Sequence, residues 1–505
     1  MSDEIMKYDV VIVGAGPAGL SAAINLKKLS TKNNVDVSVC VVEKASEVGA
    51  HILSGAVLET KALDELIPDW KSKDTPIKTK VSTEKLLFLS ENKAYSIPKL
   101  FTPAVMHNDN NYIISLGRLC KWLSDQAESM GVEIYPGFTA SKILIDDSKR
   151  VFGIKTGDHG VLKDGSKGEN YQSGIEIHSK YVFFAEGCRG HLGKQLINNF
   201  GLNEDSEHQT YGIGIKELWE VDDLNTKPGE VLHTVGWPLS EDVYGGSFLY
   251  HLDKNLISLG MVIGLDYKNP YLSPYEEFQR YKTHPFIRKI LKNGKRISYG
   301  ARALNEGGWQ SLPRLVFPGG ALLGCEAGTL NTPKIKGTHT AMKSGMIAAE
   351  SAFLAIKSGR EKDVLDCYNK NFLSSWAGEE LKKARNVRPS FKWGLKIGML
   401  LTGIDQILLR GRAPWTLSHH KPDHEATVKK ELAEKIEYPK ADGVLTFDRL
   451  TNVSFTSTYH EENQPCHLTL KDKSIPIEYN YKYFDSPEQR YCPAGVYEVL
   501  ENEQN

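Results

Sequence analysis

The hydrophobic pattern near the N-terminus alternates between strand and helix. A continuous apolar run at 8–13, YDVVIV, predicts a strand that is buried on both faces. The stretch LSAAINLKKLS at 20–30 has helical spacing, and VDVSVCVVEK at 35–44 predicts a second strand. A strand, a turn, a helix and a second strand in this order are typical of an α/β fold with a parallel sheet.

The same pattern continues along the chain. The stretch at 112–137 predicts an amphipathic helix followed by a short strand, and 181–196 predicts a strand that runs into a turn and a helix. A strand ends within 314–328, and the small-residue stretch at 334–356 predicts a long helix. Between these parts, 206–300 is rich in Tyr, Trp, Gly and Pro, and its alternating pattern predicts an inserted sheet-based domain.

The turn after the first strand carries the pattern Gly-x-Gly-x-x-Gly. Gly14 permits a tight turn, Gly16 lets the backbone approach a pyrophosphate, and Gly19 lets the helix pack closely on the strand. The helix N-terminus offers N–H groups and a positive dipole end to phosphates. Glu43 ends the second strand, where a carboxylate accepts hydrogen bonds from ribose hydroxyls. The sequence therefore predicts a dinucleotide site.

The stretches that follow favour FAD over NAD. A glycine-studded loop at 43–59 follows the second strand, as in flavoproteins of the glutathione-reductase-like fold, which the arrangement resembles. In that fold an arginine such as Arg118 approaches the FAD phosphates; the alternative for Arg118 is a surface charge at a helix start. Gly324 stands where a Gly-Asp pair meets the ribityl chain in many FAD proteins, but Cys325 replaces the aspartate.

Two apolar stretches are unusual for a protein surface. The segment 94–107 is broken by two prolines, and 393–417 holds an apolar run with tryptophans at its edges and Arg410 and Arg412 at its end. This second run is too short and too interrupted to span a bilayer. Its pattern fits either a helix that lies in one leaflet of a membrane or a buried core helix.

Composition narrows the class of protein. Apolar residues make up 40% and charged residues 25% of the 505 residues, the net charge is −1, and nothing in this balance points to nucleic acid. The seven cysteines form no Cys-x-x-Cys pair, so zinc and thioredoxin-like sites have no support, and their spacing suits a reducing compartment. No targeting peptide precedes the first strand, which favours a bacterial or a processed chain.

Several motifs together carry a family resemblance. The stretches VVIVGAGPAGLSAAI, VYGGSFLYHL, YGARALNEGGWQSLP, PKIKGTHTAMKSG, GRAPWTL and PEQRYCPAGVYE resemble the electron-transfer-flavoprotein–ubiquinone oxidoreductases. The resemblance runs from Tyr8 to about Glu498. It implies transfer of electrons from reduced electron-transfer flavoprotein to ubiquinone through FAD and a [4Fe-4S] cluster. It also implies a monotopic protein at a bacterial inner or mitochondrial inner membrane.

The resemblance gives the fold its expected divisions. An α/β fold of mixed character is expected, with a discontinuous Rossmann-type FAD domain, an inserted β-sheet ubiquinone-binding domain and a partial ferredoxin-like iron–sulfur domain. The expected FAD domain comprises 1–90, 108–205 and 300–360; the ubiquinone-binding domain comprises 206–299, and the iron–sulfur domain 436–505. The segments 94–107 and 393–417 match the membrane-contacting surface of the family.

The resemblance also assigns residues to the quinone and to the cluster. Gly245 and Gly246 match glycines whose backbone bonds a ubiquinone carbonyl, although from the pair alone a hairpin turn is the simpler interpretation. Cys492 matches the first of four cluster cysteines, and the other three stand roughly 25 residues further on in the family. This chain has 13 residues after Cys492, so we expect a C-terminally truncated form with an incomplete ligand set.

For the chemistry itself we expect electron transfer without a catalytic nucleophile or base. The loop at 49–57 and the helix start near 337–340 are candidates for tuning the flavin. His51 and His339 are either proton donors for quinone reduction or structural histidines. Two alternatives remain: a FAD-dependent monooxygenase or prenyl reductase of the same fold, and a flavoprotein subunit without catalytic activity.

Overall fold

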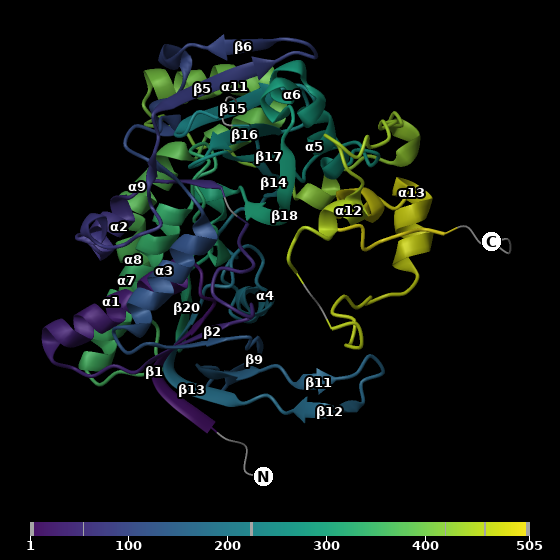
Figure 1. Ribbon diagram of the computed structural model, residues 1–505. Coiled ribbons are helices and arrows are strands. Elements are labelled where there is room, and N and C mark those ends of the chain that lie inside the picture. The colour runs from purple at the N-terminus through teal and green to yellow at the C-terminus, as the bar shows by residue number, and fades with distance from the viewer. Residues whose placement is uncertain (1–4, 54, 223–225, 420, 459–460, 501–505) are drawn as a thin grey trace.

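The computed structural model describes residues 5–500 apart from 54, 223–225, 420, 459 and 460. Two large sheets dominate this part of the chain, one above the other in the view of Figure 1. The first sheet and its helices hold the N-terminus, the second sheet lies at the opposite end, and the C-terminal segment lies beside both. A functional site that uses both sheets must therefore lie where these parts meet.

The first sheet is built around the predicted N-terminal strand. Its central strands run parallel in the order β20-β13-β1-β2-β8, and β9, β10 and β19 add antiparallel edges. Val10, Val11 and Ile12 of β1 are completely buried, which explains the continuous apolar run. The strands are β1 Ile5–Val13, β2 Val39–Glu43, β8 Glu133–Pro136, β9 Ala140–Ile145, β10 Val151–Thr156, β13 Glu176–Phe184, β19 Val316–Phe317 and β20 Gly320–Leu322.

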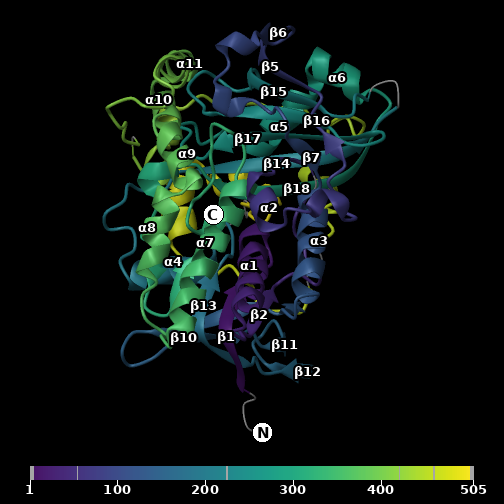
Figure 2. The ribbon, with the colours of Figure 1, turned by 90° about the vertical axis from the view of Figure 1, so that its left-hand side faces the viewer.

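Helices α1, α3 and α7 gather on one side of this sheet (Figures 1 and 2). The contact between α1 and α7 is close because Gly345 has no side chain; an added Cβ there would lie 2.2 Å from the carbonyl oxygen of Ala18. The helices of this half are α1 Pro17–Asn33, α2 Lys61–Leu66, α3 Leu116–Glu128, α4 His191–Asn199, α7 Thr338–Lys357, α8 Asp366–Ser374 and α9 Trp376–Ala384.

The second sheet has the strand order β18-β14-β17-β16-β15-β5-β6 and is antiparallel except between β15 and β5. Its strands are β5 Thr83–Leu89, β6 Ala94–Ile97, β14 Tyr211–Glu220, β15 Glu230–Gly236, β16 Gly245–His251, β17 Leu256–Gly264 and β18 Lys295–Asn305. The inserted sheet predicted at 206–300 is thus present. Two strands from the chain at 83–97 also join it, at the end of the molecule where helix α11 Leu395–Gly403 lies (Figures 1 and 2).

Part of the stretch at 206–300 is helical, contrary to a purely stranded pattern. Helices α5 Pro274–Thr283 and α6 Pro285–Leu291 pack on one face of the second sheet. Each begins with a proline in its first turn, and the Ser273 hydroxyl accepts from the N–H of Glu276 to cap α5. A proline and a capping hydroxyl start a helix even where aromatic residues favour strands. The other face of the sheet is therefore the one that turns to the first domain.

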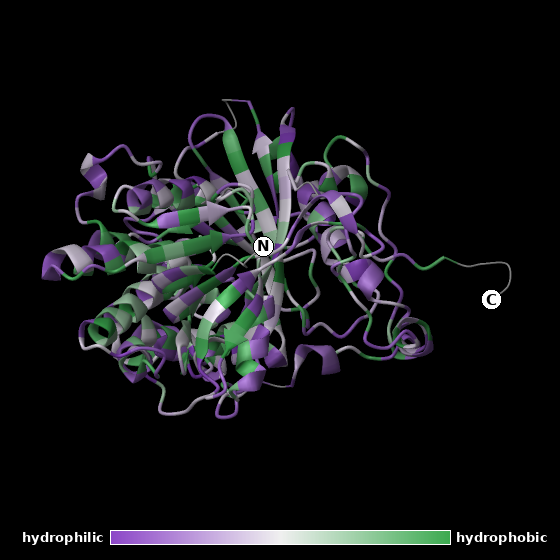
Figure 3. Ribbon diagram, turned by 90° about the horizontal axis from the view of Figure 1, so that it is seen from below, coloured by the Kyte–Doolittle hydropathy of each residue, from purple (hydrophilic) through white to green (hydrophobic). Residues whose placement is uncertain are grey.

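The remaining elements are short. They are β3 Ala56–Leu58, β4 Thr79–Lys80, β7 Tyr112–Ile114, the hairpin β11 His159–Val161 with β12 Lys167–Gln172, α10 Val387–Ser390, α11 Leu395–Gly403, α12 Arg449–Val453, α13 Lys482–Phe484 and α14 Glu488–Tyr491. Viewed from below in Figure 3, the central strands around the N-terminus are largely hydrophobic and the outer loops largely hydrophilic. The core of the first domain therefore lies between its sheet and its helices.

A buried polar contact anchors the C-terminal segment to the second sheet. The Lys282 ammonium lies 3.0 Å from both carboxylate oxygens of Glu217, and both side chains are fully buried. Asn452 of α12 donates to the same carboxylate at 3.0 Å. Because a buried charge pair is costly to break, this contact ties the segment around α12 to the face covered by α5.

Candidate cofactor and quinone sites

The glycine turn after β1 has the geometry of a phosphate site. Gly14 has φ +104°, and a Cβ there would lie 2.5 Å from the Ala185 carbonyl oxygen. A Cβ on Gly19 would lie 2.1 Å from the carbonyl oxygen of Gly14. Gly16 is different, because a Cβ there would have no described atom within 4 Å. The turn is closed on its inner side and open at Gly16, where α1 begins without a side-chain cap among the described residues.

Glu43 lies against this turn from the end of β2. One carboxylate oxygen accepts from the Ala15 N–H at 2.9 Å, and the other accepts from the Ala45 N–H at 2.9 Å. The two backbone bonds hold the carboxylate at the edge of the glycine turn. A carboxylate in this place can accept from the hydroxyls of a ribose whose phosphates lie at the start of α1.

Gly324 closes the far side of the same space. It has φ +60°, and a Cβ there would lie 2.8 Å from Cβ of Ala18 in α1 and 3.2 Å from Cβ of Ala341 in α7. Its N–H donates to the Ser344 hydroxyl at 2.9 Å. Helix α7 begins at Thr338, and Gly337 before it gives no side-chain cap. The end of β20 is therefore held against two helices, and the start of α7 keeps its N–H groups for a ligand.

Cys325 changes the chemistry beside Gly324. The thiol is half-buried, and burial raises the pKa of this group. A neutral thiol therefore stands where the resemblance leads one to expect an aspartate, and any hydrogen bond to a ribityl hydroxyl here is weaker than one to a carboxylate.

Arg118 is placed beside the glycine-studded loop. Its side chain is exposed in the first turn of α3, and its backbone N–H donates to the capping hydroxyl of Ser115 at 3.3 Å. A Cβ on Gly49 would lie 2.4 Å from the carbonyl oxygen of Gly117, so the loop after β2 rests on the start of α3. Arg118 and the loop thus border one surface.

The loop also touches the second sheet. A Cβ on Gly300 of β18 would lie 3.0 Å from a methyl group of Leu53, and the Lys216 ammonium donates to the Gly55 carbonyl at 3.2 Å. Residue 54, within the predicted tuning loop at 49–57, lies outside the described residues. The two halves of the protein therefore meet along this loop.

Two cations that the sequence analysis did not single out lie at this junction. Burial lowers the pKa of Lys216 to about 8, and the nearby charge of Arg302 adds to the effect. The Arg302 guanidinium reaches the first domain, where a Cβ on Gly187 would lie 2.7 Å from it. The sequence does mark both residues. Lys216 directly follows the uncharged strand residues GIGI, and Arg302 directly follows YGA. A charged side chain is rarely buried unless it has a partner, so a lysine or arginine in a half-buried strand indicates a contact with another part of the protein or with a ligand.

Gly245 and Gly246 begin strand β16 and do not form a two-residue hairpin turn. They pair in register with Ile263 and Val262 of β17. A Cβ on Gly246 would lie 2.9 Å from the Thr234 carbonyl oxygen, and one on Gly245 would lie 2.5 Å from that of Val262. Both glycines are half-buried. A flat ring can approach a backbone that carries no side chain here.

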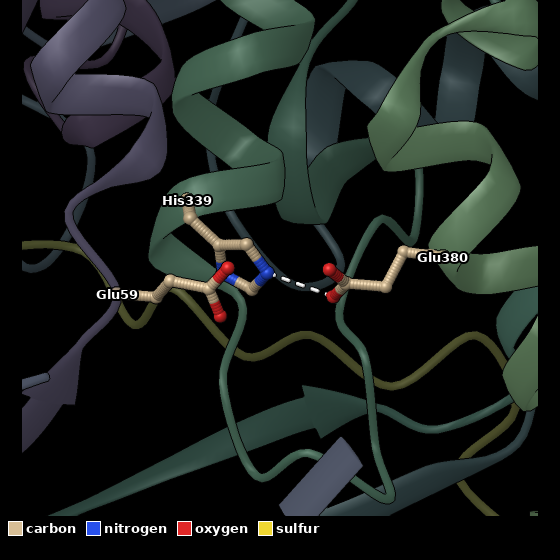
Figure 4. Close-up of side chains that lie close together, drawn as sticks. All are labelled: Glu59, His339 and Glu380. Carbon is tan, nitrogen blue, oxygen red and sulfur yellow. Dashed lines mark hydrogen bonds and ion pairs between the residues drawn. The ribbon is translucent and has the colours of Figure 1, made fainter. Parts of the chain in front are cut away.

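His339 lies between two carboxylates in Figure 4. Its Nε2 is 2.8 Å from Glu380, and the Lys334 ammonium lies 2.8 Å from Glu380 and 2.5 Å from Glu59. Burial acts to raise the pKa of Glu380, but His339 and Lys334 outweigh it and lower this pKa to about 2. The three side chains could enclose a metal ion by distance, but the lysine already supplies the positive charge. His339 is completely buried, whereas His51 is exposed.

Cys492 is buried directly after α14. The N–H of Val496 points to its sulfur at 3.5 Å, and the Tyr299 hydroxyl of β18 donates to the Pro493 carbonyl at 2.9 Å. Between 443 and 505 the sequence has one other cysteine, Cys466, which is exposed. Among the described residues no group of potential metal ligands includes a cysteine. Two thiols do not make the four-thiolate set that a [4Fe-4S] cluster requires.

An apolar surface lies at the end of the molecule formed by β6 and α11, defined by Tyr95, Leu100, Phe101, Trp393, Ile397, Leu400 and Leu408. Leu100 is 79% exposed and Leu408 is 73% exposed. Both views place α11 and β6 at the same end, opposite the N-terminus (Figures 1 and 2). None of the described helices combines the length and the apolar character that a bilayer-spanning helix needs.

Together, these features define an FAD-dependent oxidoreductase of the Rossmann type with a second sheet-based domain. Comparison with known proteins agrees. A family profile for pyridine nucleotide-disulphide oxidoreductases matches residues 8–192, one for the ETF-QO ubiquinone-binding region matches 211–304, and one for the 4Fe-4S region of electron transfer flavoprotein-ubiquinone oxidoreductase matches 443–505.

Two relatives cover nearly the whole chain. The electron transfer flavoprotein-ubiquinone oxidoreductase of Pseudomonas aeruginosa is 54% identical over 100% of this chain and 92% of its own length. The human mitochondrial protein of that name is 53% identical over 98% of this chain and 82% of its own length. The chain belongs to the electron transfer flavoprotein–ubiquinone oxidoreductase family, whose cofactors are FAD and a [4Fe-4S] cluster.

The fold recurs in more distant flavoproteins. A geranylgeranyl bacteriochlorophyll reductase-like protein from Thermoplasma acidophilum superposes with a TM-score of 0.55 at 17% identity, over 81% of this chain and 98% of its own. The flavin-dependent brominase Bmp2 gives a TM-score of 0.53 at 18% identity, over 81% of this chain and 93% of its own. At these identities the likeness concerns the fold alone.

Proposed function

We propose that this chain passes electrons from reduced electron-transfer flavoprotein to ubiquinone at a membrane surface, with FAD as the internal carrier. The observation that carries the proposal is the junction of the two halves. The glycine turn, Glu43 and the start of α7 border a cofactor space in the first domain, and the loop after β2 joins it to the face of the second sheet that carries Gly246.

Each residue on the cofactor side has a defined role in this proposal. Gly14 and Gly19 let β1 and α1 approach, and Gly16 leaves room for a pyrophosphate at the helix start. Glu43 accepts from a ribose, Arg118 contacts the phosphates, and the backbone at Gly324 borders the ribityl chain. FAD, when bound, supplies the electron-carrying chemistry, and the protein binds and orients it.

Lys216 and Arg302 are proposed to act on the flavin potential. Both project from the second sheet toward the loop at 49–57 and the Gly187 turn. A positive charge near a group that gains negative charge on reduction favours its reduced form. Because Lys216 is half-buried, its charge is less screened than one on the surface.

The quinone end is proposed to lie at Gly245 and Gly246, beneath the apolar surface. The Leu395 N–H at the start of α11 donates to the Glu241 carbonyl at 2.8 Å, so α11 is tied to the loop that leads into β16. Exposed apolar side chains with tryptophans at the edge suit a protein that lies in one leaflet. A quinone could then reach the glycines from the lipid without crossing water.

No step is assigned to the cluster, because the matched region 443–505 contains two cysteines, Cys466 and Cys492, and a [4Fe-4S] cluster is held by four thiolates. The proposal concerns the path from FAD to quinone, and electron-transfer flavoprotein enters as the donor of the family.

The test is to load the chain with FAD, reduce it anaerobically and mix it with a short-chain ubiquinone while flavin absorbance is followed. We expect rapid reoxidation in the wild type and a loss of about tenfold or more in Gly246→Ala, since the added Cβ closes the backbone to the ring. Gly157→Ala is the matched control, because its Cβ would lie 3.8 Å from the nearest atom. Equal rates in all three proteins, or flavin reduction by NADPH with no quinone reactivity, would overturn the proposal.

A further inference from the structure

A buried arginine close to the quinone end binds two carboxylates, and a third carboxyl group lies nearby. Arg388 of α10 is 6% exposed, and its Nε donates to Glu306, itself 2% exposed, at 3.0 Å. Its terminal nitrogen donates to Asp266 at 2.8 Å. Asp423 lies near enough for the charges of Asp266, Glu306 and Arg388 all to act on it. We call these four residues the Arg388 cluster.

The cluster has more carboxyl groups than cations to neutralise them. Asp423 accepts from the Tyr211 N–H at 2.7 Å through one oxygen, and its other oxygen is buried with no hydrogen-bond partner among the described residues. Three carboxylates near one guanidinium leave an excess negative charge, and Glu306 and one oxygen of Asp423 are buried away from water. One carboxyl group therefore tends to hold a proton. Consistent with this, burial raises the pKa of Asp423 to about 7.

One side of the cluster borders the proposed quinone site. The Arg388 guanidinium lies 4.0 Å from the ring centre of Tyr244, the residue directly before Gly245. The N–H of Gly264 donates to the Tyr244 carbonyl at 2.8 Å, and a Cβ on Gly264 would lie 2.9 Å from the guanidinium. The cluster is thus separated from the quinone-facing glycines by a single residue of the chain.

The other side of the cluster faces a cavity. Asp423 lines a space of about 890 Å³ between the first domain, the start of β14 and the C-terminal segment. The other charged or titratable groups that face this cavity or the cluster are Arg189, Lys194, Glu207, His208, Tyr211, Tyr267, Glu326, His419, His424, Tyr479, Glu488 and Tyr491. The cavity is large and polar enough to hold several waters.

We propose that the Arg388 cluster supplies protons to the quinone, with Asp423 taking them from the cavity and Glu306 and Asp266 passing them past Arg388. This rests on the proposed function, because it requires a quinone at Gly245 and Gly246. A quinone that becomes a quinol gains two electrons, here from the reduced flavin, and two protons. The electrons come from the bound cofactor, whereas the protons enter through the cavity that Asp423 lines.

Asp423, Glu306 and Asp266 act on the quinone through other groups and are therefore positioning residues for the proton. Their role predicts an effect that depends on pH and on the isotope of hydrogen. A purely structural contact would change the amount of folded, FAD-loaded protein instead. The neutral amide of Asp423→Asn keeps the size of the side chain and cannot carry the proton.

The experiment compares the FAD-loaded wild type with Asp423→Asn, Glu306→Gln and the control Glu425→Gln. Glu425 lies two residues from Asp423 with a 56% exposed side chain. The reduced flavin is oxidised either by a short-chain ubiquinone or by ferricenium, an acceptor that takes electrons without protons. Both reactions are followed between pH 5.5 and about 8.5, in H₂O and in D₂O.

We expect Asp423→Asn and Glu306→Gln to slow quinone reduction by about a hundredfold, to increase its solvent isotope effect and to leave ferricenium reduction unchanged. Infrared difference spectra should also lose a protonated-carboxyl band in Asp423→Asn that Glu425→Gln retains. Unchanged quinone rates, or equal losses with both acceptors, would overturn the proton role. A wild type that reduces ferricenium but not quinone would instead overturn the proposed function.

Discussion

The cofactor end and the quinone end of this protein are formed by different kinds of chemical group. The cofactor end consists mainly of backbone: three glycines and two helix starts, together with the Glu43 carboxylate that two backbone N–H groups hold. The quinone end consists of a sheet face with two glycines and, behind it, buried side-chain charges around Arg388. The close backbone contacts at Gly14 and Gly19 leave no room for an added side chain, whereas the buried charges are sensitive to a change of charge even when the size of the side chain is kept. The predictions below test this contrast.

The largest effect is expected from a side chain in the glycine turn. In Gly19→Val the new atoms would collide with the Gly14 carbonyl, so α1 must move away from β1. Overpacking of this kind costs about 1–3 kcal/mol, and the displaced helix start no longer meets the phosphates. We expect purified Gly19→Val to contain no FAD, measured by flavin absorbance after denaturation. A full flavin content would contradict the contact; Gly157→Ala is the control.

A large effect on stability is expected from one half of the buried ion pair. Lys282→Met leaves Glu217 charged and buried, which costs about 3–5 kcal/mol, and urea unfolding measures the loss. Limited proteolysis should at the same time cut the segment after residue 436 sooner. The double variant Lys282→Met/Glu217→Leu removes both charges and should recover most of the stability. A single variant within about 0.5 kcal/mol of the wild type would contradict this role.

A pH-dependent effect is expected from Asp423. Its pKa of about 7 in the folded chain lies above its ordinary value of 3.8, so the folded state binds more protons than the unfolded state between these pH values. The contribution of this group to the free energy of unfolding is therefore present at pH 4 and is lost as the pH rises toward about 7. Asp423→Asn removes this loss. We therefore expect the melting temperature of the variant to rise relative to that of the wild type between pH 5 and 8. Parallel curves would show that Asp423 titrates normally.

The smallest effect is expected from Lys216. Replacing the ammonium by an apolar side chain in Lys216→Met should lower the midpoint potential of the flavin by the equivalent of about 1 kcal/mol, since one partly screened charge is lost. A redox titration followed by flavin absorbance measures the shift. Lys142→Met, an exposed change on β9, should leave the potential unchanged. An equal shift in both variants would point to overall charge and away from a local contact.

The same contrast explains what could be predicted from the sequence. The glycine turn and Glu43 are recognisable because their spacing is local, and the strands around them follow from the apolar pattern. Gly245 and Gly246 look like a turn in isolation, and only their pairing with β17 makes them strand residues. The Arg388 cluster joins residues from 266 to 423 that no local pattern connects. Lys216 and Arg302 can be recognised in the sequence as charges within predicted strands. Their contacts with Gly55 and the Gly187 turn depend on how the two halves of the protein pack.

The most direct test of the account is to locate the quinone. A photoreactive azido-ubiquinone would be bound to the FAD-loaded chain in lipid vesicles, activated by light, and mapped by mass spectrometry. We expect the label on β16 and β17 around Gly245, Gly246 and Gly264, with loss of labelling when unmodified ubiquinone competes. Labelling confined to the cavity at Asp423 or to the first domain would contradict this proposal, because the quinone would then not bind at the sheet face that carries Gly246 and turns to the first domain.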